Sequence, residues 1–219
     1  MSLDELRRRY PWPEEQPKGR GECSGWFAGA NRTALQAAMQ PGHKVIVELG
    51  SWEGLSARWF CENMPRGATL ICIDHWEGSS EHHRRPDWAE RLELLPLTFL
   101  DNLWEHRARV IPMRTTTLAG MDELASLKIV PDVLYVDAGH EEEFVLADVG
   151  KALELWGSED TAILGDDWPH TSVRRGVVRA ATRCKLLSVY GASCWEILKG
   201  EPGNRNPPLA KDNARGLGG

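Results

Sequence analysis

Three carboxylates follow two short apolar runs of this chain and could together hold a metal ion. Residues 134–137 end in Asp137, and residues 163–167 end in Asp166 and Asp167. If both runs are parallel strands of an open sheet, their carboxyl ends lie at the edge where such sheets bind ligands. Carboxylate oxygens suit a hard cation such as Mg²⁺ better than zinc, which prefers His and Cys. We therefore expect a metal site at Asp137, Asp166 and Asp167; alternatively, Asp166 or Asp167 caps a turn or a helix.

A histidine close to Asp137 could take part in proton transfer. His140 follows Asp137 by three residues, at the expected start of a helix. Imidazole titrates near neutral pH, which suits a general base, and a nearby cation would favour its neutral form. We predict catalytic roles for His140 and Asp137, the alternative being that His140 only caps the helix or contacts a ligand.

A glycine loop upstream predicts a second ligand site. Residues 45–54 are expected to form a strand, a tight turn and a helix start, with Gly50 and Gly54 in the turn because a Cβ there would obstruct it. Their spacing differs from G-x-G-x-x-G, which favours a ligand without phosphates. Asp74, at the end of the next strand, could bind ribose hydroxyls, and Glu48 could face an ammonium group. The alternative is an ordinary strand-to-helix turn.

These residues need a sheet to position them. From Lys44 onward, short runs rich in β-branched residues alternate with longer amphipathic runs, a pattern typical of βαβ units. The expected strands are 44–48, 69–74, 109–113, 133–137, 161–166, 184–190 and 194–198, and the expected helices are 55–64, 87–106, 118–126, 141–156 and 172–182. The last two strands are close enough for a hairpin. We predict an α/β fold, Rossmann-like and doubly wound, with a seven-stranded, mostly parallel sheet and one antiparallel edge strand.

Composition sets the remaining expectations. We divide the chain into an N-terminal arm or cap (1–42), a main domain (43–199) and a flexible tail (200–219) rich in Gly, Pro and Asn. A net charge of -6 gives no electrostatic footprint for nucleic acid. Five cysteines without C-x-x-C spacing fit a reducing compartment, and no apolar run is long enough to span a bilayer. We expect a cytoplasmic protein with a small-molecule substrate and no nucleic-acid or membrane partner, which could form a homo-oligomer.

Two motifs resemble a known family. The stretch E-L-G-S-W-E-G (48–54) resembles the glycine motif of class I S-adenosylmethionine-dependent methyltransferases. The stretch I-D-H-W-E-G-S (73–79) looks like a segment of the branch related to macrocin-type and other small-molecule O-methyltransferases, and the resemblance covers about residues 43–198. It implies S-adenosylmethionine as cofactor, held by Glu48, Gly50, Ser51, Gly54, Asp74, Trp76, Arg114 and Thr115. We expect the ring of Trp76 near the adenosine and Trp168 beside the acceptor.

The resemblance extends to the acidic residues. Metal-dependent O-methyltransferases carry acidic ligands at the positions of Asp137, Asp166 and Asp167, and the catechol-type enzymes carry a basic lysine at the position of His140. Macrocin-type relatives carry an acidic residue one position earlier, where this chain has Gly139. The implied function is Mg²⁺-assisted O-methylation of a small hydroxylated molecule, a sugar or phenol of secondary metabolism. Gly139 motivates an alternative, a methyltransferase-like binding or regulatory module without turnover.

Overall fold

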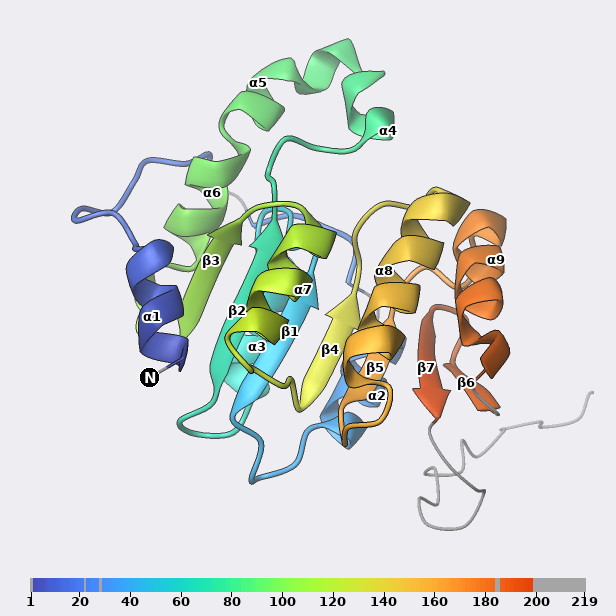
Figure 1. Cartoon of the computed structure of the whole chain (residues 1–219). Coiled ribbons are helices and arrows are strands. Elements are labelled where there is room, and N and C mark those ends of the chain that lie inside the picture. Colours follow the sequence, from blue (N-terminus) through green and yellow to red (C-terminus); the bar gives the residue numbers. More distant parts are fainter. Residues whose placement is uncertain (1, 22, 28, 184–185, 199–219) are drawn as a thin grey trace, which may run out of the picture.

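The computed structural model describes residues 2–21, 23–27, 29–183 and 186–198, and these contain one seven-stranded sheet of order β3-β2-β1-β4-β5-β7-β6 (Figure 1). The strands are β1 (Val45–Leu49), β2 (Thr69–Asp74), β3 (Val110–Arg114), β4 (Val133–Val136), β5 (Ala162–Gly165), β6 (Leu186–Tyr190) and β7 (Cys194–Leu198). The first five are parallel, and β7 is antiparallel to both neighbours. The predicted fold class is confirmed, with β7 one strand in from the edge strand β6.

Alternating side chains give the sheet two buried faces. In β1, Ile46 packs into one hydrophobic cluster, whereas Val47 and Leu49 pack into the other. Successive residues of a strand point to opposite faces, so a strand buried on both sides must be apolar throughout. This explains the short continuous apolar runs of the sequence.

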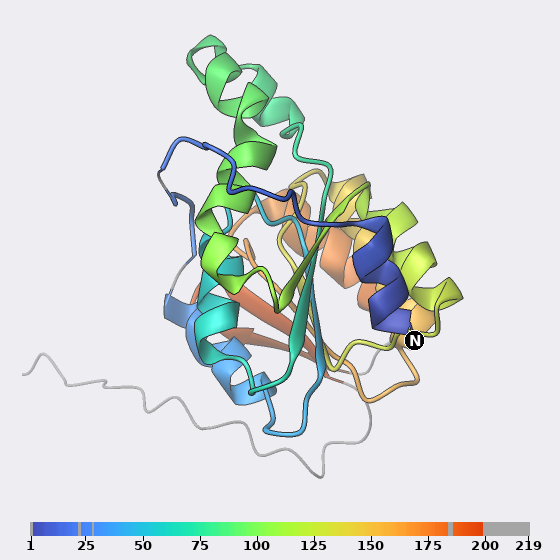
Figure 2. The ribbon, with the colours of Figure 1, turned by 90° about the vertical axis from the view of Figure 1, so that its left-hand side faces the viewer.

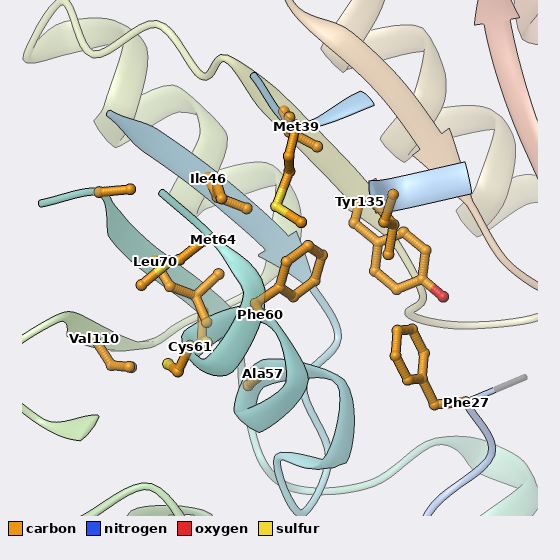
Figure 3. Packing of buried hydrophobic residues seen from close by; sticks show 14 of the residues in the cluster. Phe27, Met39, Ile46, Ala57, Phe60, Cys61, Met64, Leu70, Val110 and Tyr135 are labelled. Carbon is orange, nitrogen blue, oxygen red and sulfur yellow. The ribbon is translucent and has the colours of Figure 1, made fainter. Parts of the chain in front are cut away.

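Helices cover both faces (Figures 1 and 2). One face is covered by α2 (Gly29–Ala38), α3 (Leu55–Asn63) and α6 (Leu95–Asn102), whose buried residues share a cluster with Ile46. In that cluster the rings of Phe27 and Phe60 pack edge-on against Tyr135, at centroid distances of 6.2 and 5.8 Å (Figure 3). The other face is covered by α1 (Ser2–Arg9), α7 (Thr117–Ser126), α8 (Glu142–Trp156) and α9 (Thr171–Ala180).

The predicted arm contributes to both helical layers. Leu6 of α1 is fully buried in the cluster that also contains residues of α7, and the Tyr10 hydroxyl donates to Glu123 at 2.6 Å. Ala34 and Leu35 of α2 are buried in the opposite cluster. The extended chain between α1 and α2 reaches the carboxyl ends of the strands, where residues 24–27 line a cavity.

One predicted helix is wrong. Residues 87–106 form four short pieces: η1 (Pro86–Trp88), α5 (Ala89–Glu93), α6 and η2 (Trp104–His106). Pro96 lies in the first turn of α6 and has no N–H to donate to the preceding turn, so the helix restarts there. With α4 (Ser80–His83), η1 and α5 form a cap, distinct from the N-terminal arm, that projects beyond the carboxyl ends of β1 and β2 (Figures 1 and 2).

The other predicted helices agree with the structure to within a few residues. The predicted tail, 200–219, lies outside the described residues, as do the first two residues of the strand expected at 184–190. Among the described helices, none combines the length and the hydropathy needed to cross a bilayer.

Candidate functional site

A cavity of about 950 Å³ lies at the carboxyl ends of the parallel strands, within the size range of small-molecule sites. Its walls come from the N-terminal segment, the loops after β1 to β5, the cap, and the first turns of α7 and α8. The lining residues are 24–27, 50–52, 55, 56, 73–75, 78–82, 85, 88, 116–118, 137–141, 144, 147, 148, 167 and 170.

The glycine loop has the predicted sharp turn. Gly50 has φ of 83° and lines the cavity, and a Cβ there would lie 2.1 Å from the carbonyl oxygen of Asp137. Gly54 has φ of 92° at the start of α3, but a Cβ there would meet the side chains of Leu103 and Phe99. Gly50 thus leaves room for a ligand, whereas Gly54 leaves room for packing and lies outside the cavity wall.

Asp74 joins two loops of the cavity. Its Oδ2 accepts the backbone N–H groups of Ser51 at 2.9 Å and Trp52 at 3.0 Å, and its Oδ1 accepts that of Trp76 at 2.6 Å. Because each carboxylate oxygen has two lone pairs, Asp74 can still accept a ligand hydroxyl. Asp74 and Ser51, which the sequence predicted as cofactor-binding residues, both line the cavity.

Glu48 does not face the cavity. Its side chain is fully buried beneath the glycine loop, where Oε2 accepts from Ser51 Oγ at 2.5 Å and from Cys72 Sγ at 3.5 Å. Burial raises the pKa of Glu48 to about 7. The expectation that it faces a ligand ammonium is therefore replaced by a role beneath the loop, holding Ser51.

Three more residues that were predicted to contact the cofactor do not line the cavity. The indole of Trp76 is 3% exposed, packs on Phe99 and donates to the carbonyl of Trp52 at 2.9 Å, so its ring is buried and does not line the cavity. Arg114 and Thr115 end the β3 segment without lining the cavity. The residues that line it there are the next three, Thr116, Thr117 and Leu118, because the chain turns inward only at the start of α7.

The acidic side of the cavity brings together Asp137, His140 and Asp167. Donor atoms of the three lie within 4.8 Å of one another, with His140 Nε2 2.7 Å from Asp167 Oδ2. Burial, and then the charges of Asp166 and Asp167, raise the pKa of Asp137 well above its ordinary value. The hydrogen bond with Asp167 raises the pKa of His140.

Asp166 does not belong to this group. Its side chain is 5% exposed and accepts from Asn31 Nδ2 at 2.5 Å, from the Asp167 backbone N–H at 2.7 Å and from the Ser193 hydroxyl. The predicted metal ligand Asp166 thus ties α2 and the β6–β7 hairpin to β5. Side chains of consecutive residues in an extended strand point to opposite sides. In addition, the backbone of Asp167 has a positive φ of 63°, which turns its side chain toward the cavity. The two carboxylates therefore point in different directions.

The donor set fits a divalent cation. Asp137 and Asp167 supply carboxylate oxygens, His140 supplies an imidazole nitrogen, and all three line the cavity, where open coordination positions would face a substrate. Within the described part of the chain, no side chain or backbone group is hydrogen-bonded to the Asp137 carboxylate, which leaves it free to bind an ion. Of the three predicted metal ligands, Asp137 and Asp167 belong to this group and Asp166 does not, and the predicted base His140 lies beside the two carboxylates.

Sequence reasoning missed an aromatic group that lines the same cavity. Trp52 packs against His82 and Trp88 at ring-centroid distances of 4.3 and 5.7 Å, and Trp26 stacks on Trp88 at 6.2 Å. Trp52 belongs to the glycine loop (48–54) that the sequence predicted, whereas Trp26, His82 and Trp88 were not among the predicted site residues. In contrast, Trp168, expected beside the acceptor, packs against the core.

Comparisons with known proteins place this architecture in a family. The family model described as a methyltransferase domain matches residues 47–168, more than half of the chain. No curated protein matches the sequence.

Two similar solved structures have TM-scores of 0.55. The O-methyltransferase TomG from Streptomyces achromogenes, involved in tomaymycin synthesis and solved with SAM, is 15% identical over 91% of this chain and 90% of its own. A SAM-dependent O-methyltransferase from Thermotoga maritima is 11% identical over 93% of this chain and 73% of its own. The family match and the shared fold lead to one conclusion: the chain belongs to the methyltransferase family and has the fold of the class I S-adenosylmethionine-dependent enzymes.

Proposed function

We propose that this protein is an S-adenosylmethionine-dependent O-methyltransferase that acts on a small hydroxylated acceptor, a sugar or phenol of secondary metabolism, with assistance from a divalent cation such as Mg²⁺. The observation that carries the proposal is the cavity itself. It is lined both by the Gly50 loop with Asp74 and by the group of Asp137, His140 and Asp167. The two similar solved structures are both O-methyltransferases, which supports O-methylation as the reaction.

The cofactor would lie along the loops after β1, β2 and β3. Gly50 lets a ligand approach the backbone, Asp74 offers acceptor capacity for ribose hydroxyls, and Thr116 and Thr117 line the adjoining wall. When bound there, S-adenosylmethionine supplies the methyl group. The loop needs no rearrangement to present these groups, because Asp74 already holds the N–H groups of Ser51 and Trp52.

The acceptor would lie beside the acidic group. Asp137 and Asp167 would hold the cation, which when bound lowers the pKa of an acceptor hydroxyl. His140 donates its Nε2–H to Asp167 at 2.7 Å and would take the proton of that hydroxyl at its other ring nitrogen, Nδ1. Holding the hydroxyl and the methyl donor in one cavity accounts for much of the expected rate enhancement through positioning.

The test is methyl transfer from S-adenosylmethionine labelled in the methyl group, measured by mass spectrometry with a panel of phenols and sugars in the presence of MgCl₂. The proposal expects a labelled product with at least one acceptor and a strong loss of turnover in Asp137→Ala. Cofactor binding without product from any acceptor, and without an effect of Asp137→Ala, would favour the silent binding module instead.

A further inference from the structure

Three tryptophans from three separate segments meet on the wall of the cavity that also holds the acidic group. Trp26 comes from the N-terminal segment, Trp52 from the glycine loop and Trp88 from the cap, and all three line the cavity. Trp26 and Trp88 are stacked with 18° between their planes, and Trp26 is still 70% exposed. We call Trp26, Trp52 and Trp88 the tryptophan wall.

A buried ion pair connects the three segments. Glu53 is 1% exposed in its side chain and accepts from Arg91 Nε at 2.6 Å. Its other oxygen accepts the backbone N–H of Ser24 at 3.1 Å and the Ser24 hydroxyl at 2.8 Å. Glu53 belongs to the glycine loop, Arg91 to α5 and Ser24 to the N-terminal segment. One carboxylate therefore fixes the relative positions of all the segments that carry the wall.

Arg91 also supports the rings directly. Its guanidinium carbon lies 5.2 Å from the ring centroid of Trp52 and 4.7 Å from that of Trp88. A planar guanidinium can stack on an aromatic face while its N–H groups bind a carboxylate in the same plane. The ion pair and the wall are thus one structural unit.

The polar groups around the wall already bind one another. Arg91 and Ser24 are engaged by Glu53, and Arg85, whose guanidinium carbon lies 4.3 Å from the Trp88 ring centroid, pairs with Asp87 at 3.0 Å. His82 accepts the Ser79 N–H at 2.9 Å. The wall consequently offers flat apolar faces and one free donor, the buried Trp52 Nε1–H, which has no hydrogen-bond partner among the described residues, whereas recognition of a sugar requires several polar groups that are free to bind its hydroxyls.

We propose that the tryptophan wall binds the methyl acceptor, that it selects an acceptor with a planar aromatic ring over a sugar, and that the Glu53–Arg91 pair positions it. This inference rests on the function proposed above and narrows its acceptor to the phenolic class. The ring would lie against the wall with its hydroxyl directed toward Asp137 and Asp167.

The first test uses isothermal titration calorimetry on the full chain saturated with S-adenosylhomocysteine and MgCl₂. Catechol and methyl α-rhamnoside serve as acceptor probes. We expect catechol to bind and the rhamnoside not to bind, and Trp26→Ala to weaken catechol binding by about tenfold, the scale of one aromatic contact. Trp26 is exposed, so its replacement leaves the core intact. Binding of the rhamnoside but not catechol, or unchanged catechol affinity in Trp26→Ala, would overturn the proposal.

The second test separates positioning from general stability. Glu53→Gln removes the charge that holds Arg91, and Glu62→Gln, which breaks the exposed Arg58–Glu62 pair, is the matched control. We expect Glu53→Gln to weaken catechol binding by about tenfold and S-adenosylhomocysteine binding by less than about twofold, with no effect of the control. Ser24→Ala, which removes one donor to the same carboxylate, should weaken catechol binding in the same direction if Glu53→Gln fails to fold.

The outcomes distinguish the two proposals. If S-adenosylhomocysteine does not bind the unaltered protein, the proposed function fails. If it binds but Glu53→Gln and Ser24→Ala take up catechol like the Glu62→Gln control, only the positioning role is contradicted.

Discussion

The imidazole of His140 lies 2.7 Å from the carboxylate of Asp167, so side chains from the loops after β4 and β5 meet inside the cavity. His140 stands three residues beyond Asp137, whereas Asp167 follows a different strand, 27 positions further along the chain than His140. Only the parallel pairing of β4 with β5 brings them together.

Asp167→Asn should weaken divalent-cation binding. The substitution replaces a charged oxygen donor by a neutral amide, and we expect a loss of affinity for Mn²⁺ or Mg²⁺ of at least about tenfold, with S-adenosylhomocysteine affinity changed by less than about twofold. Calorimetric titrations with the metal ion and with S-adenosylhomocysteine measure the two affinities. Asp122→Asn, an exposed acid paired with Lys151 on the surface, is the control. Equal metal affinity in the two variants would remove Asp167 from the site.

Gly50→Ala should abolish cofactor binding. The new Cβ would lie 2.1 Å from the Asp137 carbonyl oxygen, so the glycine loop must shift away from the position that lines the cavity. Gly67→Ala is the matched control, since Gly67 has a similar φ of 80° but open space around it. We expect S-adenosylhomocysteine binding to fall by at least about tenfold in Gly50→Ala and to stay unchanged in Gly67→Ala, which shares only the cost of a left-handed alanine. Equal binding in both would contradict the role of the loop.

Asp166→Ala should act on stability and not on metal affinity. The change leaves Asn31, Ser193 and the Asp167 N–H without their shared acceptor, and we expect the free energy of unfolding to fall by about 2–4 kcal/mol. Urea unfolding measures the loss, and calorimetry with Mn²⁺ on the folded variant measures the affinity. Unchanged stability together with lost metal binding would restore Asp166 to the ligand set.

Asp148→Asn should stabilise the protein, and more so at higher pH. Burial raises the pKa of Asp148 to about 6, and its carboxylate accepts from Thr117 Oγ1 at 2.5 Å, a bond that the asparagine oxygen can keep. Between the unfolded and folded pKa values the native state holds a proton that the unfolded chain has lost, so the stability of the unaltered protein falls as pH rises through this window.

In Asp148→Asn, residue 148 does not titrate and contributes no pH dependence to the free energy of unfolding. Its advantage in unfolding free energy should therefore be about 1–2 kcal/mol greater at pH 7.5 than at pH 5, measured by urea unfolding without ligand. Asp122→Asn should show no comparable change, because that carboxylate is exposed. An Asp148→Asn advantage that is the same at both pH values would show that Asp148 carries no burial penalty.

The fold could be predicted largely from local patterns. The seven strands and the helices of the main domain follow from the alternation of apolar and amphipathic runs. An apolar run indicates a strand buried on both faces, and an amphipathic run indicates a helix buried on one face. The prediction of a single helix over residues 87–106 was wrong because Pro96 breaks a run that is otherwise helical in composition. The helix α2 went unpredicted, since its buried contacts, among them Leu35 and Asn31, are made with distant parts of the chain.

The site could be predicted only where position along a strand decides it. Gly50, Asp74 and Asp137 were found because each lies at a strand end, and strand ends of a parallel sheet converge. Side-chain direction beyond the strand could not be read, and so Asp166 and Trp76 were assigned to a cavity that their side chains do not reach. Trp26 and Trp88 reach the site from segments whose placement depends on Glu53, a contact without a local sequence signal.

The most direct test of the account is calorimetric titration of the unaltered protein with S-adenosylhomocysteine, with and without MgCl₂. The account predicts one binding site per chain, lost in Gly50→Ala and kept in Gly67→Ala. No measurable binding under either condition, in a protein shown to be folded, would contradict the assignment of this cavity to the cofactor.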